Sequence, residues 1–121
     1  PEHRPENVRY DGRFEVPTLD EIIALVRQHE RETGRQVGLY PETKHPTYFR
    51  SRGHAMEETL VRTLHDAGYR GRDAKVFIQS FEVTNLRQLR AMTELRLVQL
   101  LWTDGQPYDQ REQGTSLTYA E

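Results

Sequence analysis

Residues 38–46 read Gly-Leu-Tyr-Pro-Glu-Thr-Lys-His-Pro, a short apolar run that leads directly into a carboxylate and an ammonium group. Because side chains alternate between the two faces of a strand, Glu42 and Lys44 are predicted to point the same way at the strand's end. The carboxyl ends of parallel strands are where α/β folds and barrels place their chemistry. A carboxylate there can hold a hard cation, and an ammonium group can contact a phosphate. The alternative is a simple salt bridge between the two side chains.

The rest of the chain alternates between helical and strand-like patterns. The capping-box form of Thr18 to Glu21 and the apolar stripes that follow predict helices over 18–33, 54–67 and 82–92. Short apolar runs predict strands over 37–43, 75–80 and 96–101. This order favours an α/β fold with parallel strands, adjacent in sequence order, and right-handed crossovers. Since three strands leave both sheet edges open, we expect part of a larger barrel; a small independent sheet is the structural alternative.

Length and composition limit the classes of protein. The chain has 121 residues, a net charge of −2 and no cysteine, so it has no basic surface that would indicate nucleic acid and no disulfide or thiolate metal site. No apolar run is long enough to span a membrane. The chain begins at Pro1 in a polar stretch without an initiating Met or a signal-peptide pattern, and we interpret it as an internal piece of a longer protein.

Four stretches, taken in order, resemble the glycerophosphodiester phosphodiesterase family. They are residues 14–21, 39–46, 76–82 and 97–101. The Tyr-Pro-Glu-x-Lys-x-Pro motif at 40–46 and Ile-Gln-Ser-Phe at 78–81 are fairly specific in combination. The longer Thr-Lys-His-Pro-Thr-Tyr-Phe form at 43–49 is similar to the secreted or periplasmic bacterial branch.

The resemblance implies a TIM (β/α)8 barrel, of which this chain would be one segment, about strands 3 to 5 with their helices. Residues 1–16 and 103–121 are then loops, and 17–102 are βα units. It also implies hydrolysis of glycerophosphodiesters to an alcohol and glycerol 3-phosphate, in lipid and glycerol metabolism, with Ca²⁺ or Mg²⁺ as the divalent cation.

The same resemblance assigns roles to five residues. It implies that Glu42 is a metal ligand and that Lys44 is a catalytic residue that contacts the phosphate. It places Phe81 at the pocket rim near the glycerol, with Gln79 and Gln99 as weaker substrate-binding candidates. From the residues alone, Phe81 can equally be a packing residue, and the two glutamines can be polar layers that cap a core.

The family's His-Arg-Gly and Glu-x-Asp motifs are not in this stretch, so no complete general acid and base is present. We therefore expect the isolated chain to be inactive, and we expect the rest of a barrel, or another chain, to cover the sheet edges. One alternative is a non-catalytic barrel fragment that binds phosphate or a partner. Another is an unrelated aldolase or isomerase barrel in which Lys44 forms a Schiff base, which the neighbouring Glu42 disfavours.

Overall fold

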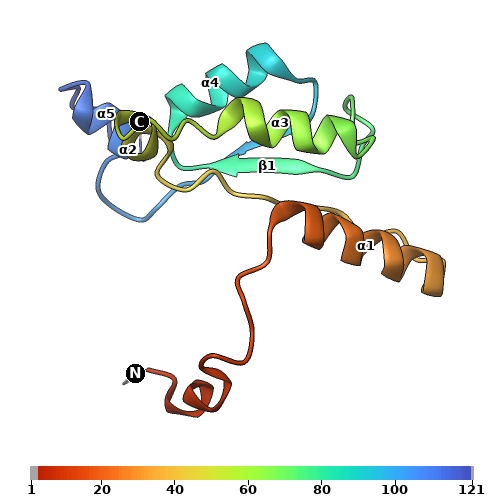
Figure 1. Ribbon diagram of the computed structural model, residues 1–121. Coiled ribbons are helices and arrows are strands. Elements are labelled where there is room, and N and C mark those ends of the chain that lie inside the picture. Colours follow the sequence, from red (N-terminus) through yellow and green to blue (C-terminus); the bar gives the residue numbers. More distant parts are fainter. Residues whose placement is uncertain (1–2, 121) are drawn as a thin grey trace. The chain divides into compact units, whose positions relative to one another are not determined.

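In the computed structural model, which describes residues 3–120, the chain divides into two units, Pro1–Arg35 and Gln36–Glu121 (Figure 1). The first unit contains a 3-10 helix, η1 (Pro5–Tyr10), and helix α1 (Leu19–Thr33). The capping box is formed as predicted: the Thr18 N–H donates to Glu21 Oε2 at 2.7 Å, and the Glu21 N–H donates to Thr18 Oγ1 at 3.3 Å. The sequence predicts a loop over residues 5–10, because a helix as short as η1 shows no helical periodicity.

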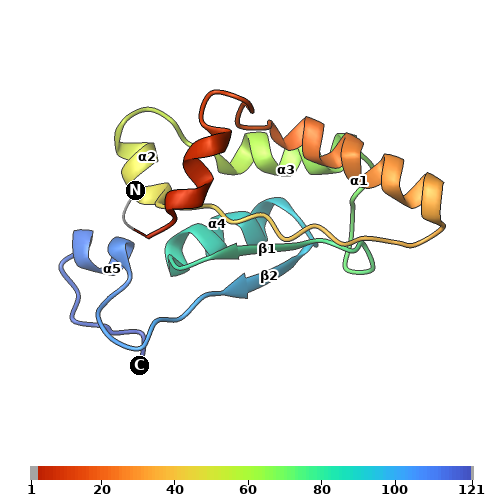
Figure 2. The same ribbon diagram turned by 90° about the horizontal axis from the view of Figure 1, so that it is seen from below.

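A parallel sheet forms the centre of the second unit. Strand β1 (Phe77–Ser80) pairs in parallel with β2 (Arg96–Gln99), with Phe77 opposite Arg96 and Ser80 opposite Gln99. The extended segment over 39–43 lies along the other side of β1, through parallel bridges from Leu39 to Val76 and from Glu42 to Gln79. In Figure 2 this segment, β1 and β2 run side by side in that order. The predicted adjacency and parallel direction are therefore confirmed.

The segment over 39–43 is not a regular strand, and Pro41 explains why. The Leu39 N–H donates to the Lys75 carbonyl at 2.8 Å, and the Thr43 N–H donates to the Gln79 carbonyl at 3.0 Å. Between them, Pro41 accepts from the Gln79 N–H at 2.9 Å but has no N–H of its own to return to β1. The ladder thus lacks one hydrogen bond in its middle, and only isolated bridges remain on either side.

Two helices cover one face of the sheet, α3 (Glu57–Asp66) and α4 (Val83–Met92) (Figure 1). Fully buried apolar side chains fill the space between these helices and the sheet, namely Leu64, Val76, Ile78, Leu89 and Leu95. The helices predicted over 18–33, 54–67 and 82–92 are confirmed as α1, α3 and α4, with ends trimmed by a few residues.

Two short helices were not predicted from the sequence, α2 (Pro46–Ser51) and α5 (Tyr108–Glu112), and α5 lies in the stretch assigned to a loop. Both lie at the carboxyl end of β1 in Figures 1 and 2. Pro46 occupies the first turn of α2, where a missing N–H costs nothing. No helix in the described residues is long and apolar enough to cross a membrane.

Candidate active site at the carboxyl edge of the sheet

Exposure alternates along the segment that carries the candidate site. Glu42 and Lys44 are exposed, whereas Thr43 between them is only 2% exposed. Since Glu42 is bridged to Gln79, these two side chains project from the same face of the sheet. Lys44 and Phe81 each follow this bridged pair by two residues, where the paired backbone ends. The structure therefore brings Glu42 and Gln79 together on the sheet face that α3 and α4 leave uncovered, with Lys44 exposed at the same edge and Phe81 just past the end of β1.

Glu42 and Lys44 do not bond to one another. Neither side chain makes an ion pair within 4.0 Å to any other residue among 3–120. The simple salt bridge considered from the sequence is therefore absent, and both charged groups are exposed to the solvent.

Gln79 and Gln99 lie on opposite faces of the sheet. Gln79 shares the face of Glu42, and its Nε2 donates to the Tyr40 carbonyl at 2.9 Å. Gln99 is paired with the buried Ser80 and so projects to the side of the helices. There it lines a pocket of about 380 Å³ together with Leu101 and Tyr119.

Phe81 belongs to an aromatic cluster at the carboxyl edge. Its ring contacts Trp102 edge to face at a centroid distance of 6.4 Å, and Tyr119 in the same manner at 5.9 Å. Trp102 is 65% exposed, so the cluster lies at the rim of the edge and is not part of the core. Phe81 thus packs against its neighbours and is also placed to form a wall of a site.

A buried polar network beneath Glu42 and Lys44 was missed from the sequence. The Thr43 hydroxyl donates to Asn85 Oδ1 at 2.6 Å, and Asn85 Nδ2 donates to Glu57 Oε1 at 2.6 Å. The other oxygen of Glu57 lies 2.8 Å from an Arg50 guanidinium nitrogen, an ion pair without the alignment of a hydrogen bond. A signal was present: Asn85 precedes Leu89 by four residues and so lies on the apolar stripe of α4.

Two more carboxylates, Glu82 and Asp109, are buried at this edge. Glu82 Oε2 accepts from the Thr47 N–H at 3.1 Å, and Asp109 Oδ2 accepts from the Thr84 N–H at 2.8 Å. Burial raises the pKa of Glu82 above its ordinary value, and the negative charge of Asp109 adds to the rise. The remaining oxygen of each carboxylate has no hydrogen-bond partner among the described residues.

A divalent cation needs several ligand side chains close together. Among residues 3–120, no three His, Cys, Asp or Glu side chains lie close enough together to hold a metal ion. Hard cations take six or more oxygen ligands, some of them water. Glu42, exposed at the carboxyl edge, fits the role of one such ligand.

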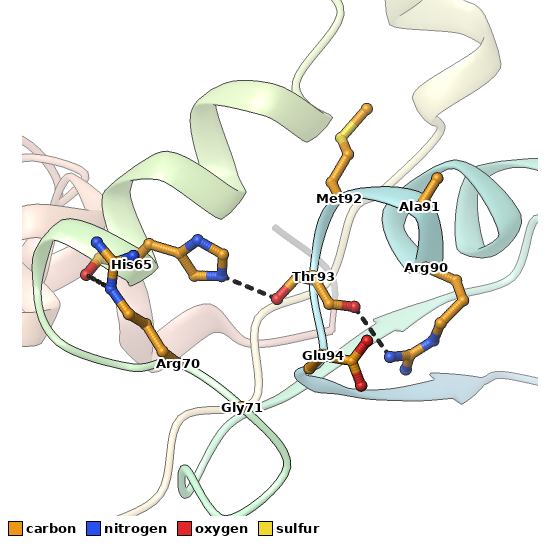
Figure 3. Close-up of a pocket in the computed structure, with 8 residues that line it drawn as sticks. All are labelled: His65, Arg70, Gly71, Arg90, Ala91, Met92, Thr93 and Glu94. Carbon is orange, nitrogen blue, oxygen red and sulfur yellow. Dashed lines mark hydrogen bonds between the residues drawn. The ribbon is translucent and has the colours of Figure 1, made fainter.

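A second concave region, of about 340 Å³, lies at the opposite edge of the sheet (Figure 3). Its basic side chains are occupied: Arg70 Nε donates to the His65 carbonyl, and Arg90 donates to the carbonyls of Thr93 and Leu95. The His65 carbonyl lies in the last turn of α3, and those of Thr93 and Leu95 follow the end of α4, where helix dipoles are negative and attract cations. Both arginines therefore stabilise helix ends.

Comparisons with known proteins place the chain in a family. Residues 2–120 match the model of the glycerophosphoryl diester phosphodiesterase family. A glycerophosphodiester phosphodiesterase of Haemophilus influenzae is 25% identical over 120 residues, covering 91% of this chain and 33% of the relative. One from Arabidopsis thaliana is 33% identical over 98 residues, covering 71% and 25%. One from Treponema pallidum is 26% identical over 77 residues, covering 64% and 22%.

This chain has a parallel α/β sheet, and folds of that class place their chemistry at the carboxyl ends of the strands. The match over nearly its whole length is specific: this chain belongs to the glycerophosphoryl diester phosphodiesterase family. It spans a third or less of the length of these relatives.

Proposed function

We propose that this chain is an internal segment of a metal-dependent phosphodiesterase that hydrolyses glycerophosphodiesters to an alcohol and glycerol 3-phosphate. The observation that carries the proposal is that Glu42 and Lys44 are both exposed, on either side of the buried Thr43, at the carboxyl edge of the sheet in a chain of this family. Gln79 is bridged to Glu42 and so shares its face, and Phe81 follows directly after β1.

The segment supplies charge to the reaction and does not supply the proton transfers. A cation held in part by Glu42, Ca²⁺ or Mg²⁺, would neutralise charge on the phosphoryl oxygens when bound. Lys44 can donate hydrogen bonds to the same oxygens from its position at that edge, and its positive charge opposes the charge that develops on them. Phe81 would exclude water beside the glycerol, and Gln79 would offer its amide to a glycerol hydroxyl.

In this proposal Gln99 binds a part of the substrate away from the phosphate. It faces the pocket of about 380 Å³ at the same edge, away from Glu42. That pocket is lined mainly by apolar side chains and a tyrosine, including Leu101, Leu117 and Tyr119. It can take a part of the substrate that extends around the edge beyond the phosphate.

We further propose that the parent fold is a (β/α)8 barrel, with these three extended segments as about its third to fifth strands. Two observations support this. Within the second unit, α3 and α4 lie on one sheet face, and the other face carries the exposed rings of Tyr40 and Phe77. The rest of a barrel, or another chain, would cover that face and pair both open edges. By resemblance to the bacterial branch, the parent would be periplasmic or secreted.

The test is an assay of the full-length protein beside the isolated 121-residue chain, with glycerophosphocholine as the substrate, with and without added Ca²⁺ or Mg²⁺. We expect cation-stimulated release of glycerol 3-phosphate from the full-length protein and none from the isolated chain. A full-length protein that binds glycerophosphodiesters without cleaving them would instead support a non-catalytic binding role.

A further inference from the structure

The turn that carries Glu42 and Lys44 is held from beneath by a buried side chain of α4. Thr43, between the two charged residues, has its hydroxyl 2.6 Å from Asn85 Oδ1, and both side chains are 2% exposed. The Ser80 hydroxyl donates to the Thr43 carbonyl at 3.3 Å, from β1. The residue between the two candidate site residues is therefore fixed through both its side chain and its backbone.

Asn85 is itself fixed in orientation. Its Nδ2 donates to Glu57 Oε1 at 2.6 Å, and Glu57 is 1% exposed. A flipped amide would place Oδ1 against the Glu57 carboxylate, which is repulsive, so only one orientation satisfies both ends. The other Glu57 oxygen is paired with Arg50 on α2, the helix that follows the turn. Asn85, on α4, therefore links the turn to Glu57 of α3 and, through Glu57, to Arg50 of α2.

The chain after Lys44 is held in the same way. Glu82 Oε2 accepts from the backbone N–H of Thr47 at 3.1 Å. Between these anchors, His45 has a φ of 51°, in the left-handed region that residues with a side chain avoid. Such a conformation persists only where the surroundings impose it. The geometry of the turn is thus set by its contacts and not by local preference.

We propose that Asn85 is a positioning residue for the phosphodiesterase reaction: through Thr43 it determines where Glu42 and Lys44 project. This inference rests on the proposed function. A contribution to folding stability does not by itself explain why a buried amide lies between Thr43 and Glu57. Burying an amide costs free energy that its hydrogen bonds only balance, and apolar pairs of similar shape can do as well. The hydrogen bonds of Asn85 do fix the orientation of Thr43 relative to Glu57, which an apolar contact would not do.

The test compares two Thr→Val changes in the full-length protein. Thr43→Val keeps the side-chain shape and removes the hydroxyl, which lies 2.6 Å from Asn85 Oδ1 and 3.3 Å from the Gln79 carbonyl. Thr93→Val is the matched control at the opposite edge: Thr93 is 6% exposed, and its hydroxyl contacts His65 Nε2 at 2.9 Å and the Leu95 N–H at 3.1 Å (Figure 3). Thr43→Ser restores the hydroxyl. For each variant, the thermal midpoint, kcat, KM and the Ca²⁺ affinity from calorimetric titration are measured.

We expect the two valine variants to lose similar thermal stability. Only Thr43→Val should also lose kcat, by about tenfold or more, because displacements of about 1 Å in positioned groups can cost about 100-fold. Its Ca²⁺ affinity should weaken, and Thr43→Ser should recover most of both losses. A Thr43→Val enzyme whose kcat and Ca²⁺ affinity match those of Thr93→Val would overturn the inference.

A second variant guards against a failure of Thr43→Val to fold. Asn85→Leu removes both hydrogen bonds of the amide with a side chain of similar size. It should lower kcat as Thr43→Val does, and the double variant should be no slower than either, because both break one link. Additive losses in kcat would refute the link. A wild-type full-length protein without hydrolysis would refute the proposed function, and the positioning role with it.

Discussion

Replacing Glu42 with glutamine should damage metal binding while leaving the fold intact. Glu42 is exposed and has no ion-pair partner within residues 3–120, so the change removes charge without removing a packed contact. Surface changes of this kind alter the free energy of unfolding by about 0.5 kcal/mol or less. For a domain of modest size that is a shift of about 2–4 °C at most in the thermal midpoint.

The expected effect on the metal is much larger. Hard cations bind anionic oxygens best, and loss of even an outer supporting group costs about 10–100-fold in affinity. Glu42→Gln in the full-length protein should therefore weaken Ca²⁺ or Mg²⁺ binding by at least about tenfold. Lys44→Ala is the companion variant. It should lower kcat by about 10²–10³-fold, as loss of one charge-stabilising donor does, with metal affinity largely unchanged.

The assay combines calorimetric titration of the cation with initial rates over a range of cation concentrations. A high cation concentration should partly rescue Glu42→Gln and should not rescue Lys44→Ala. If the Glu42→Gln protein binds the cation and turns over like the wild type, Glu42 is not a ligand, and the assignment of this edge as the metal site is wrong.

Three further predictions concern the fold, its pH dependence and the isolated chain. Thr18→Ala should lower stability by about 1 kcal/mol in urea denaturation, since it breaks the capping box of α1, and Thr18→Ser should restore it. Glu82→Gln keeps an acceptor for the Thr47 N–H and removes a buried charge, so it should raise the thermal midpoint at pH 7. Because the folded pKa of Glu82 is raised, that gain should vanish as the pH falls through it towards the ordinary carboxyl range; an equal gain at pH 4 contradicts this account. The isolated chain should self-associate in sedimentation velocity through its open sheet edges, and a stable monomer would count against the partial barrel.

Helix and strand prediction succeeded where the signals are local. The capping box at Thr18 fixed the start of α1, and the apolar stripes of α3 and α4 identified the helices that bury them. Helices of five or six residues, α2 and α5, are too short to show periodicity, and they form where tertiary contacts hold them.

The candidate site was predictable only in part. The alternation that points Glu42 and Lys44 to one side is a property of extended backbone, and the sequence shows it directly. The buried amide of Asn85 was not recognised, although its place on the apolar stripe of α4 was visible. Its partners Thr43 and Glu57 lie far away in the chain, and only packing brings them within hydrogen-bonding distance.

The order of the three longer helices and of the extended segments could be predicted from the sequence, as could the family and the alternation that carries Glu42 and Lys44, because each depends on residues close together in the chain. Which residues lie beside Glu42 and Lys44 depends on tertiary packing. Hydrogen bonds between distant segments set the register, and the register puts Gln79 beside Glu42 and sends Gln99 to the other face. A shift of one residue would exchange the faces, since side chains alternate with a period of two. No local pattern contains that information.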